Sequence, residues 1–125
     1  MARILIIDDD VPVRRIICRM LEREGYDVIE ASDGDLGVKM YSDQPTDLVI
    51  TDIVMPNKEG LETIKELKKK YPDVKIIALS GGGQIPGRHY LQLAKKLGAL
   101  CTFEKPFNWQ QLIKSVNEIL AKEEG

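Results

Sequence analysis

RILIIDDD, at residues 3–10, places an apolar run directly before three aspartates. The apolar part, residues 4–7, has the length and the β-branched composition of a buried strand. In an open parallel sheet, ligands bind beyond the carboxyl ends of the strands, so the polar residues that follow a strand are the ones to examine. This stretch therefore predicts a buried strand whose carboxyl end carries Asp8, Asp9 and Asp10.

Four further apolar runs follow, at residues 28–29, 48–51, 74–79 and 100–103. Segments with helical spacing separate the runs and close the chain, at residues 13–21, 36–41, 61–67, 90–97 and 112–120. Because parallel neighbours need crossover connections, this alternation predicts an α/β doubly wound, five-stranded parallel sheet with helices on both faces. Pro12 suits a first helical turn, and Gly25 and Gly98 suit helix ends. Asp27 and Glu30 flank the second run and favour an edge strand.

The composition is that of one globular domain, and we expect residues 1–125 to form a single unit. Twenty acidic and 18 basic residues give a net charge of −2, which disfavours binding to nucleic acid or to an anionic membrane. No apolar stretch is long enough to span a membrane, and residues 3–10 do not fit a signal peptide, so we expect a cytoplasmic protein. Cys18 and Cys101 lack metal-binding spacing and are expected to be buried free thiols.

Polar residues follow the predicted strands at one rim of the sheet. Asp8 and Asp9 would face Asp52, and carboxylates this close repel one another unless a cation intervenes. An all-oxygen site with few ligands suits Mg²⁺. Ser80 offers a hydroxyl and Lys105 a positive charge, which together suit a phosphoryl group on or near a carboxylate. The alternative is that the aspartates after the first strand only cap a helix.

With these residues in place, the chain resembles a response-regulator receiver domain, similar to stand-alone chemotaxis and phosphorelay regulators, over essentially all of its length. The resemblance rests on the acidic pair at residues 8–9, DIVMP at residues 52–56, Gly60, Ser80, GA at residues 98–99 and KPF at residues 105–107. It implies a flavodoxin-like fold with strand order 2-1-3-4-5.

The resemblance also implies roles for the polar residues. Asp52 is expected to be the phosphoacceptor. Asp9, Asp52 and the backbone carbonyl of Val54 are expected to bind Mg²⁺ directly, and Asp8 to act through water. Ser80 and Lys105 are expected to contact the phosphoryl group.

Three further features follow from the same resemblance. The Lys105–Pro106 peptide is expected to be cis. Ser80 and Thr102 occupy the switch positions, but Thr102 stands where the family usually has an aromatic residue. The spacing of 25 between Ser80 and Lys105 is about three residues longer than expected, which predicts an extended loop within residues 81–87.

The implied function is a phosphorylation-activated signalling switch rather than an enzyme. A sensor histidine kinase or phosphotransfer protein would supply the phosphoryl group, and an unidentified protein would read the surface of the fourth helix, fifth strand and fifth helix. The sequence does not decide whether phosphorylation leads to a homodimer. The alternatives are a haloacid-dehalogenase-like phosphatase with Asp8 as nucleophile, a receiver-like scaffold that accepts no phosphate, and a flavin-binding module.

Overall fold

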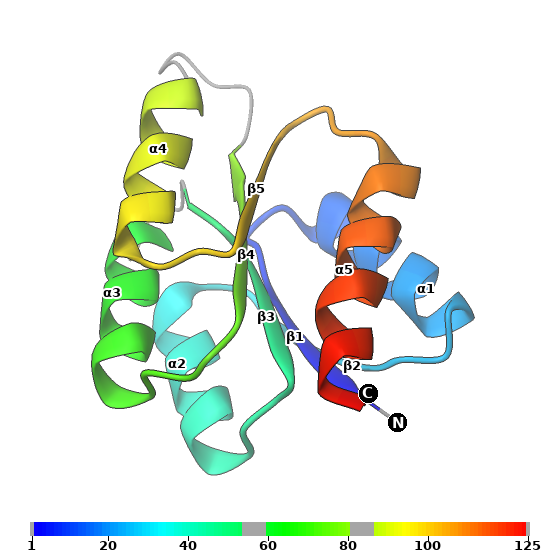
Figure 1. Cartoon of the computed structure of the whole chain (residues 1–125), viewed down its shortest axis with the longest axis horizontal. Coiled ribbons are helices and arrows are strands. Elements are labelled where there is room, and N and C mark those ends of the chain that lie inside the picture. The colour runs from blue at the N-terminus through cyan, green and yellow to red at the C-terminus, as the bar shows by residue number, and fades with distance from the viewer. Residues whose placement is uncertain (1, 54–59, 81–86, 125) are drawn as a thin grey trace.

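Within residues 2–53, 60–80 and 87–124, which the structure describes, a computed structural model shows five strands alternating with five helices (Figure 1). The strands are β1 (Arg3–Ile7), β2 (Asp27–Ala31), β3 (Leu48–Asp52), β4 (Ile76–Ser80) and β5 (Cys101–Glu104). The helices are α1 (Val11–Arg23), α2 (Gly34–Asp43), α3 (Gly60–Lys70), α4 (Gly87–Leu97) and α5 (Trp109–Glu124).

All strand pairs are parallel, and the strand order is β2-β1-β3-β4-β5. The predicted fold class, strand order and edge position of β2 are thereby confirmed. Helices α1 and α5 cover one face of the sheet, and α2, α3 and α4 cover the other (Figure 1). Strand order reverses between β1 and β3, so the carboxyl ends of these two strands border the crevice where such folds bind ligands.

Covering both faces explains why the central strands are apolar along their whole length. Successive side chains of β1 point to opposite faces, so Leu5 and Ile7 join the core under α2, α3 and α4, while Ile4 and Ile6 join the core under α1 and α5. Every residue of β3 and β4 is buried. These continuous apolar runs are what made the strands recognisable in the sequence.

Two predicted strands begin too early. Val74 is buried, but its amide donates to the carbonyl of Tyr71 in the turn after α3, so β4 begins only at Ile76. Leu100 is 47% exposed and precedes β5, which begins at Cys101. The Leu100 amide donates to the carbonyl of Ile76 in β4, but the paired register of β4 and β5 begins only at Cys101, and hydrophobicity alone does not show where such a register begins.

Local signals at the helix ends act as predicted. Asp10 caps α1, because its side chain accepts a hydrogen bond of 3.2 Å from the amide of Val13, and Pro12 lies in the first turn. Gly25 and Gly98 have φ angles of +95° and +119°, the left-handed conformation that glycine adopts without strain. The capping alternative is therefore correct for Asp10.

Both cysteines are free thiols. Burial, helped by the neighbouring charge of Glu30, raises the pKa of Cys18 to about 12. Cys101 is only half-buried because β5 is an edge strand, so the expectation of two buried cysteines holds for Cys18 alone. No helix in the described part of the chain is both long enough and apolar enough to cross a membrane.

Candidate functional site

Three carboxylates meet where β1 and β3 end. Asp8 and Asp9 follow β1, Asp52 ends β3, and Ile7 pairs with Thr51 in the sheet, so the two strand ends are level. One oxygen from each carboxylate lies within 4.8 Å of the others. Asp8 is fully buried, Asp52 is 4% exposed, and Asp9 faces solvent. Such a set of oxygen donors, open on one side, fits a magnesium ion that keeps some of its water.

Asp8 is held at four atoms. Its amide donates to the carbonyl of Ala31 at 3.1 Å, and its carbonyl accepts from Nη1 of Arg14 at 2.7 Å. Its Oδ1 accepts from the amide of Asp10 at 2.9 Å, and its Oδ2 accepts from Nζ of Lys105 at 2.9 Å. With both carboxylate oxygens engaged in a fully buried residue, Asp8 is poorly placed to act as the nucleophile of a phosphatase.

Lys105 joins the two buried carboxylates. Its ammonium lies 2.9 Å from Asp8 Oδ2 and 3.3 Å from Asp52 Oδ2, and its backbone amide donates to the carbonyl of Ser80 at 2.8 Å. Burial disfavours its charge, but the hydrogen bond that it donates to Asp8 and the charges of Asp52 and Asp8 outweigh burial, so the pKa of Lys105 lies above its ordinary 10.5. Lys105 therefore stays charged and neutralises part of the acidic cluster.

Ser80 brings an unpartnered hydroxyl to the same rim. The residue ends β4, next to β3, and is 1% exposed. Within the described ranges its Oγ has no hydrogen-bond partner. A buried hydroxyl left without a partner costs the folded state about 1–3 kcal/mol of stability. This hydroxyl is therefore well suited to donate a hydrogen bond to an oxygen of a ligand.

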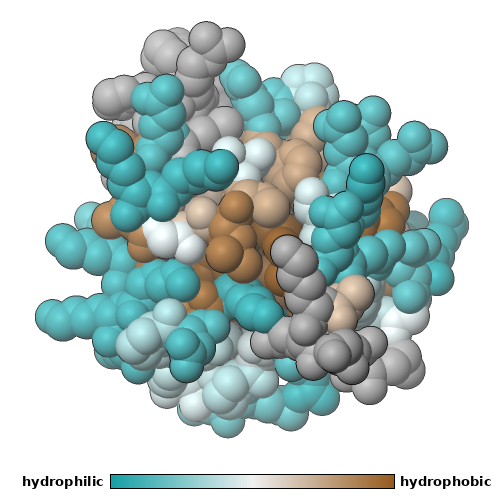
Figure 2. All heavy atoms as spheres, viewed as in Figure 1, coloured by the Kyte–Doolittle hydropathy of each residue, from teal (hydrophilic) through white to brown (hydrophobic). Residues whose placement is uncertain are grey.

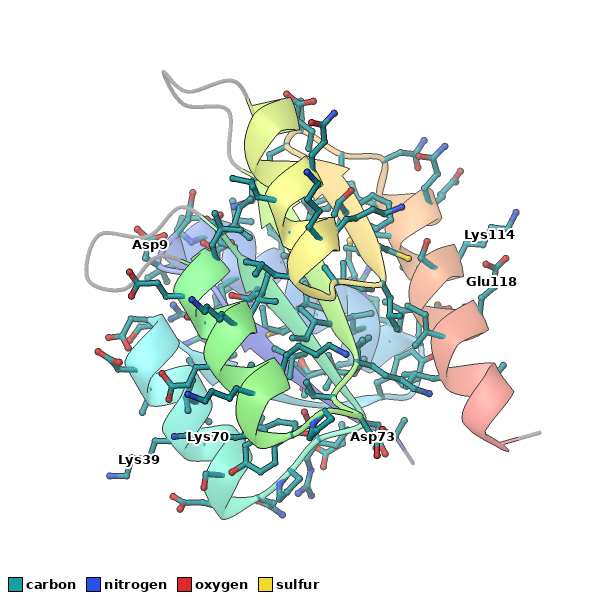
Figure 3. The ribbon with its side chains drawn as sticks, turned by 60° about the vertical axis from the view of Figure 1, so that its left-hand side comes forward. Asp9, Lys39, Lys70, Asp73, Lys114 and Glu118 are labelled. Atoms are coloured by element: carbon teal, nitrogen blue, oxygen red, sulfur yellow. The ribbon has the colours of Figure 1, made fainter. Side chains whose placement is uncertain are left out.

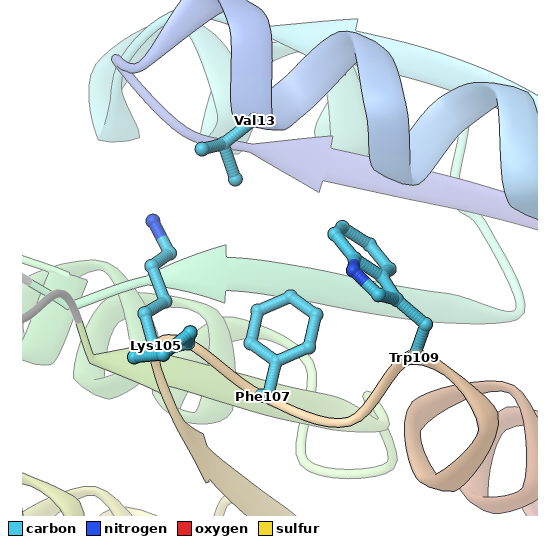
Figure 4. Close-up of a pocket in the computed structure, with 5 residues that line it drawn as sticks. Val13, Lys105, Phe107 and Trp109 are labelled. Carbon is cyan, nitrogen blue, oxygen red and sulfur yellow. The ribbon is translucent and has the colours of Figure 1, made fainter.

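An apolar pocket adjoins Lys105 on the side of α1 (Figure 4). Its volume is about 350 Å³, and it is lined by Val13, Lys105, Pro106, Phe107 and Trp109. The rings of Phe107 and Trp109 meet edge to face, with centroids 4.7 Å apart. The pocket lies between the N-terminal part of α1 and the segment that joins β5 to α5, directly beside the polar site.

The structure brings together five of the predicted site residues: Asp8, Asp9, Asp52, Ser80 and Lys105. The Lys105–Pro106 peptide is cis, as predicted. Thr102 is half-buried in β5 and pairs with Ala78 of β4. Val54 and residues 81–86 of the predicted extended loop lie outside the described residues.

Two residues beside the site escaped the sequence analysis. Arg14 of α1 contacts the carbonyl of Asp8, and its Nε donates to Glu30 of β2 at 2.9 Å. No spacing rule links positions 14 and 30. The only signal available in the sequence was indirect, since the implied order 2-1-3-4-5 places β2 beside β1 and brings Glu30 near the start of α1.

The site lies at one end of the molecule. In Figure 3, Asp9 is near this end, whereas Lys70 and Asp73 lie at the opposite end, near the start of β4. The carboxylate site therefore lies at the opposite end of the molecule from Lys70, whose Nζ lies 3.2 Å from Oε2 of Glu66.

Comparison with known proteins agrees with this arrangement. Residues 4–117 match the family model of the response regulator receiver domain. The chain is 29% identical to sporulation initiation phosphotransferase F of Bacillus subtilis, covering 94% of this chain and 93% of that protein. It is 32% identical to the transcriptional regulatory protein CpxR of Escherichia coli, covering 98% of this chain but about half of that protein's length, 50%.

Solved structures show the same fold. A response regulator receiver domain protein from Clostridium thermocellum superposes with a TM-score of 0.89 at 32% identity, covering 99% of this chain and 98% of that one. The response regulator TrrA from Thermotoga maritima, solved in complex with Mg²⁺ and beryllium fluoride, gives a TM-score of 0.84 at 35% identity, covering 95% of this chain and 99% of that one.

Proposed function

Because the chain belongs to the response regulator receiver domain family, whose members are phosphoacceptor switches of two-component systems, we propose that Asp52 accepts the phosphoryl group. One observation carries the assignment: the Asp52 carboxylate lies 3.3 Å from the Lys105 ammonium, at the rim where β4 presents the unpartnered Ser80 hydroxyl. Asp8 also reaches Lys105 but is fully buried and engaged at both oxygens.

The transfer forms one bond and breaks one. An oxygen of the Asp52 carboxylate attacks the phosphorus of a phosphohistidine, and the electron pair of the breaking P–N bond returns to the imidazole nitrogen of the donor. Lys105 stabilises the negative charge on the phosphoryl oxygens, and Ser80 donates its hydroxyl hydrogen to one of them. The step consumes only the carboxylate and the phosphohistidine.

Asp9 and Asp52 are the residues we assign to direct Mg²⁺ binding, with Asp8 acting through water. The Val54 carbonyl, which lies outside the described residues, completes the assigned set. The close grouping of the three carboxylates supports this assignment. When bound, the ion neutralises charge on the carboxylates and on the transferred group. The chain itself thus performs phosphoryl transfer onto and off its own carboxylate, as a cytoplasmic regulatory domain spanning residues 1–125, and turns over no separate substrate.

Two exposed surfaces suit protein partners. Val11 and Ile16 of α1 are 50% and 47% exposed, and Val13 of the same helix lines the apolar pocket, which favours docking of a sensor histidine kinase or phosphotransfer protein at α1. On the other side, hydrophobic residues gather along the middle of the face shown in Figure 2, where β5 forms the sheet edge. Leu100, which directly precedes β5, is 47% exposed.

This second surface, formed by α4, β5 and α5, is the assigned output surface. Ser80 and Thr102, in the neighbouring strands β4 and β5, link it to the phosphoryl site. Its reader is a separate output protein or a second copy of the chain. A scaffold that accepts no phosphate would have no need for the buried carboxylates, the lysine and the hydroxyl together.

Dependence on Mg²⁺ tests the proposed site. Acetyl phosphate should phosphorylate the protein in millimolar Mg²⁺ and not after chelation, because the uncompensated carboxylates repel an anionic donor. Asp9→Asn should weaken Mg²⁺ binding at least tenfold in a calorimetric titration, since it removes one of two direct carboxylates. Asp10→Asn is the matched control, because Asp10 caps α1 and should leave the affinity unchanged. Equal affinities in both variants would remove Asp9 from the site.

A further inference from the structure

We propose that Arg14, anchored by Glu30, is a positioning residue that orients the Asp8–Asp9 peptide and thereby sets the Mg²⁺ affinity of the site. The inference rests on the proposed function, because it concerns the same metal site. It assigns a role to an ion pair that lies outside the group of carboxylates, the lysine and the serine.

The argument begins with the contacts of the guanidinium. Nη1 of Arg14 donates to the carbonyl of Asp8 at 2.7 Å, and Nε donates to Oε1 of Glu30 at 2.9 Å. The side chains of Arg14 and Glu30 are 13% and 30% exposed, so both hydrogen bonds are partly shielded from water. The planar guanidinium holds two acceptors in a fixed relative geometry, which a lysine ammonium does not reproduce.

The carbonyl of Asp8 belongs to the same rigid unit as the amide of Asp9. A peptide bond is planar, so holding this carbonyl fixes the plane that leads into Asp9 and thus the positions of the Asp9 nitrogen and Cα, from which its side chain starts. In the described part of the chain, no hydrogen bond or ion pair restrains the carboxylate of Asp9. Its direction is therefore set by the backbone, and Arg14 is the residue that holds the carbonyl of the Asp8–Asp9 peptide.

Glu30 makes this restraint independent of the loop itself. It lies in β2, where it pairs with Ile6 of β1, two residues before Asp8. The guanidinium thus connects three elements: the edge strand β2, the first helix α1 and the end of β1. Asp8, Asp9 and Asp10 form the whole connection between β1 and α1, which leaves little slack to absorb a rotated peptide.

A second ion pair on the same two strands provides a matched control. Nε of Arg3 lies 2.9 Å from Oδ2 of Asp27, the same separation as in the Arg14–Glu30 pair. Arg3 begins β1 and Asp27 begins β2, so this pair lies at the end of the sheet remote from the site. Removing it should cost stability without changing the aspartates.

The sign of the effect separates positioning from simple electrostatics. If Arg14 acted only as a nearby positive charge, its removal would tighten Mg²⁺ binding, because like charges repel. If it positions Asp9, its removal loosens a ligand, and loss of an outer-shell partner typically weakens metal binding about tenfold or more. Arg14→Lys retains the charge but loses the planar fork, so only the positioning role predicts weaker binding for that variant.

The experiment is a calorimetric titration of the full chain with MgCl₂ alone, together with thermal melting in its absence. We expect Arg14→Met and Arg14→Lys to bind Mg²⁺ about tenfold more weakly than wild type, and Glu30→Gln about threefold more weakly. Arg3→Met should melt a few degrees lower with unchanged affinity. With acetyl phosphate, the Arg14 variants should need more Mg²⁺ but reach a rate within about twofold of wild type at saturation.

The results for the Arg14 variants test the positioning role, and the results for wild type and Asp9→Asn test the metal site. Wild-type or tighter Mg²⁺ binding in Arg14→Lys overturns the positioning role, even if Arg14→Met does not fold. If wild type binds Mg²⁺ and Asp9→Asn weakens it while the Arg14 variants match wild type, this inference fails and the proposed metal site stands. If wild type binds no Mg²⁺, the proposed site fails and the inference with it.

Discussion

At the scale of single residues, Lys105 acts in the metal-free protein as the cation that the acidic cluster requires. Its ammonium bridges the carboxylates of Asp8 and Asp52, both of which are buried. An ion that enters the site must share these carboxylates with Lys105. The same contacts that hold the site together in the absence of metal therefore oppose metal binding.

Replacing Lys105 by Gln should separate these two effects. Without Mg²⁺, the variant should lose about 3 kcal/mol of unfolding free energy, because two buried carboxylates lose their counter-charge. Its Mg²⁺ affinity should rise about tenfold, because the competing charge is gone. Urea unfolding and calorimetry measure the two quantities. Lys70→Gln, which removes only an exposed pair with Glu66, should change neither, and a lower Mg²⁺ affinity in Lys105→Gln would contradict the competition.

The pKa of Lys105 determines the pH range over which Lys105 contributes to the unfolding free energy. A lysine whose pKa is raised by folding stabilises the folded state fully below its unfolded pKa of about 10.5, and the contribution disappears as the pH rises through the higher folded pKa. The difference in unfolding free energy between wild type and Lys105→Gln should therefore stay constant between about pH 7 and 9 and shrink only above about pH 10.5.

The residue scale is also where sequence reasoning reached its limit. Asp8, Asp52, Ser80 and Lys105 could be predicted because each directly follows or ends a strand, and parallel strands bring their carboxyl ends to one rim. Arg14 could not be predicted, because its role depends on a helix side chain that reaches a backbone carbonyl. Every residue has a backbone carbonyl, so residue types and their spacing do not indicate which carbonyl a side chain contacts.

At the scale of elements, close packing of α3 against the end of β3 holds Asp52 in place. The amide of Gly60 donates to the carbonyl of Ile53 at 3.1 Å, so the first residue of α3 contacts the chain directly after Asp52. A Cβ at position 60 would overlap the carbonyl oxygen of Asp52 and the Cα of Ile53. Both are backbone atoms of a buried segment and have little room to move.

Gly60→Ala should therefore affect stability and phosphorylation together. We expect a loss of about 1–3 kcal/mol in unfolding free energy and a slower reaction with acetyl phosphate, because the end of β3 must shift. Gly25→Ala is the control: a Cβ there meets no atom within 4 Å, and only its φ of +95° disfavours alanine. That variant should lose about 1 kcal/mol and react like wild type. Normal phosphorylation of Gly60→Ala would show that Asp52 does not depend on this contact.

The elements themselves were largely predictable from the sequence, whereas their bounds were less so. Strands β1 and β3 are buried on both faces, so apolar runs mark them almost to the residue. The starts of β4 and β5 were placed too early because Val74 and Leu100 are apolar without belonging to a strand. Where pairing with a neighbour decides the bound, local composition carries no information about it.

At the scale of the whole molecule, the site and the assigned output surface are joined by two neighbouring strands. Ser80 ends β4, and Lys105 follows β5 directly, so a group that draws both side chains inward pulls on adjacent strand ends. Thr102 is smaller than the aromatic residue expected at its position and buries less surface in a rearranged state. The switch should therefore be a shift between states of similar stability.

Hydrogen exchange with and without beryllofluoride and Mg²⁺ measures this shift. Amide protection should change in α4 and β5 as well as around Asp52, because Ser80 and Lys105 respond to the added group. The buried amides of α2, which packs against β1 and β2, serve as the internal reference. Changes confined to the surroundings of Asp8 and Asp52 would show that α4, β5 and α5 are not the output surface.

The central claim is that Asp52 receives the phosphoryl group, and intact-mass spectrometry after incubation with acetyl phosphate and Mg²⁺ tests it most directly. We predict one added phosphoryl group, about 80 Da, on the wild-type chain and none on Asp52→Asn, with Asp10→Asn modified like wild type. An Asp52→Asn variant that still gains one phosphoryl group to the wild-type extent would contradict the account.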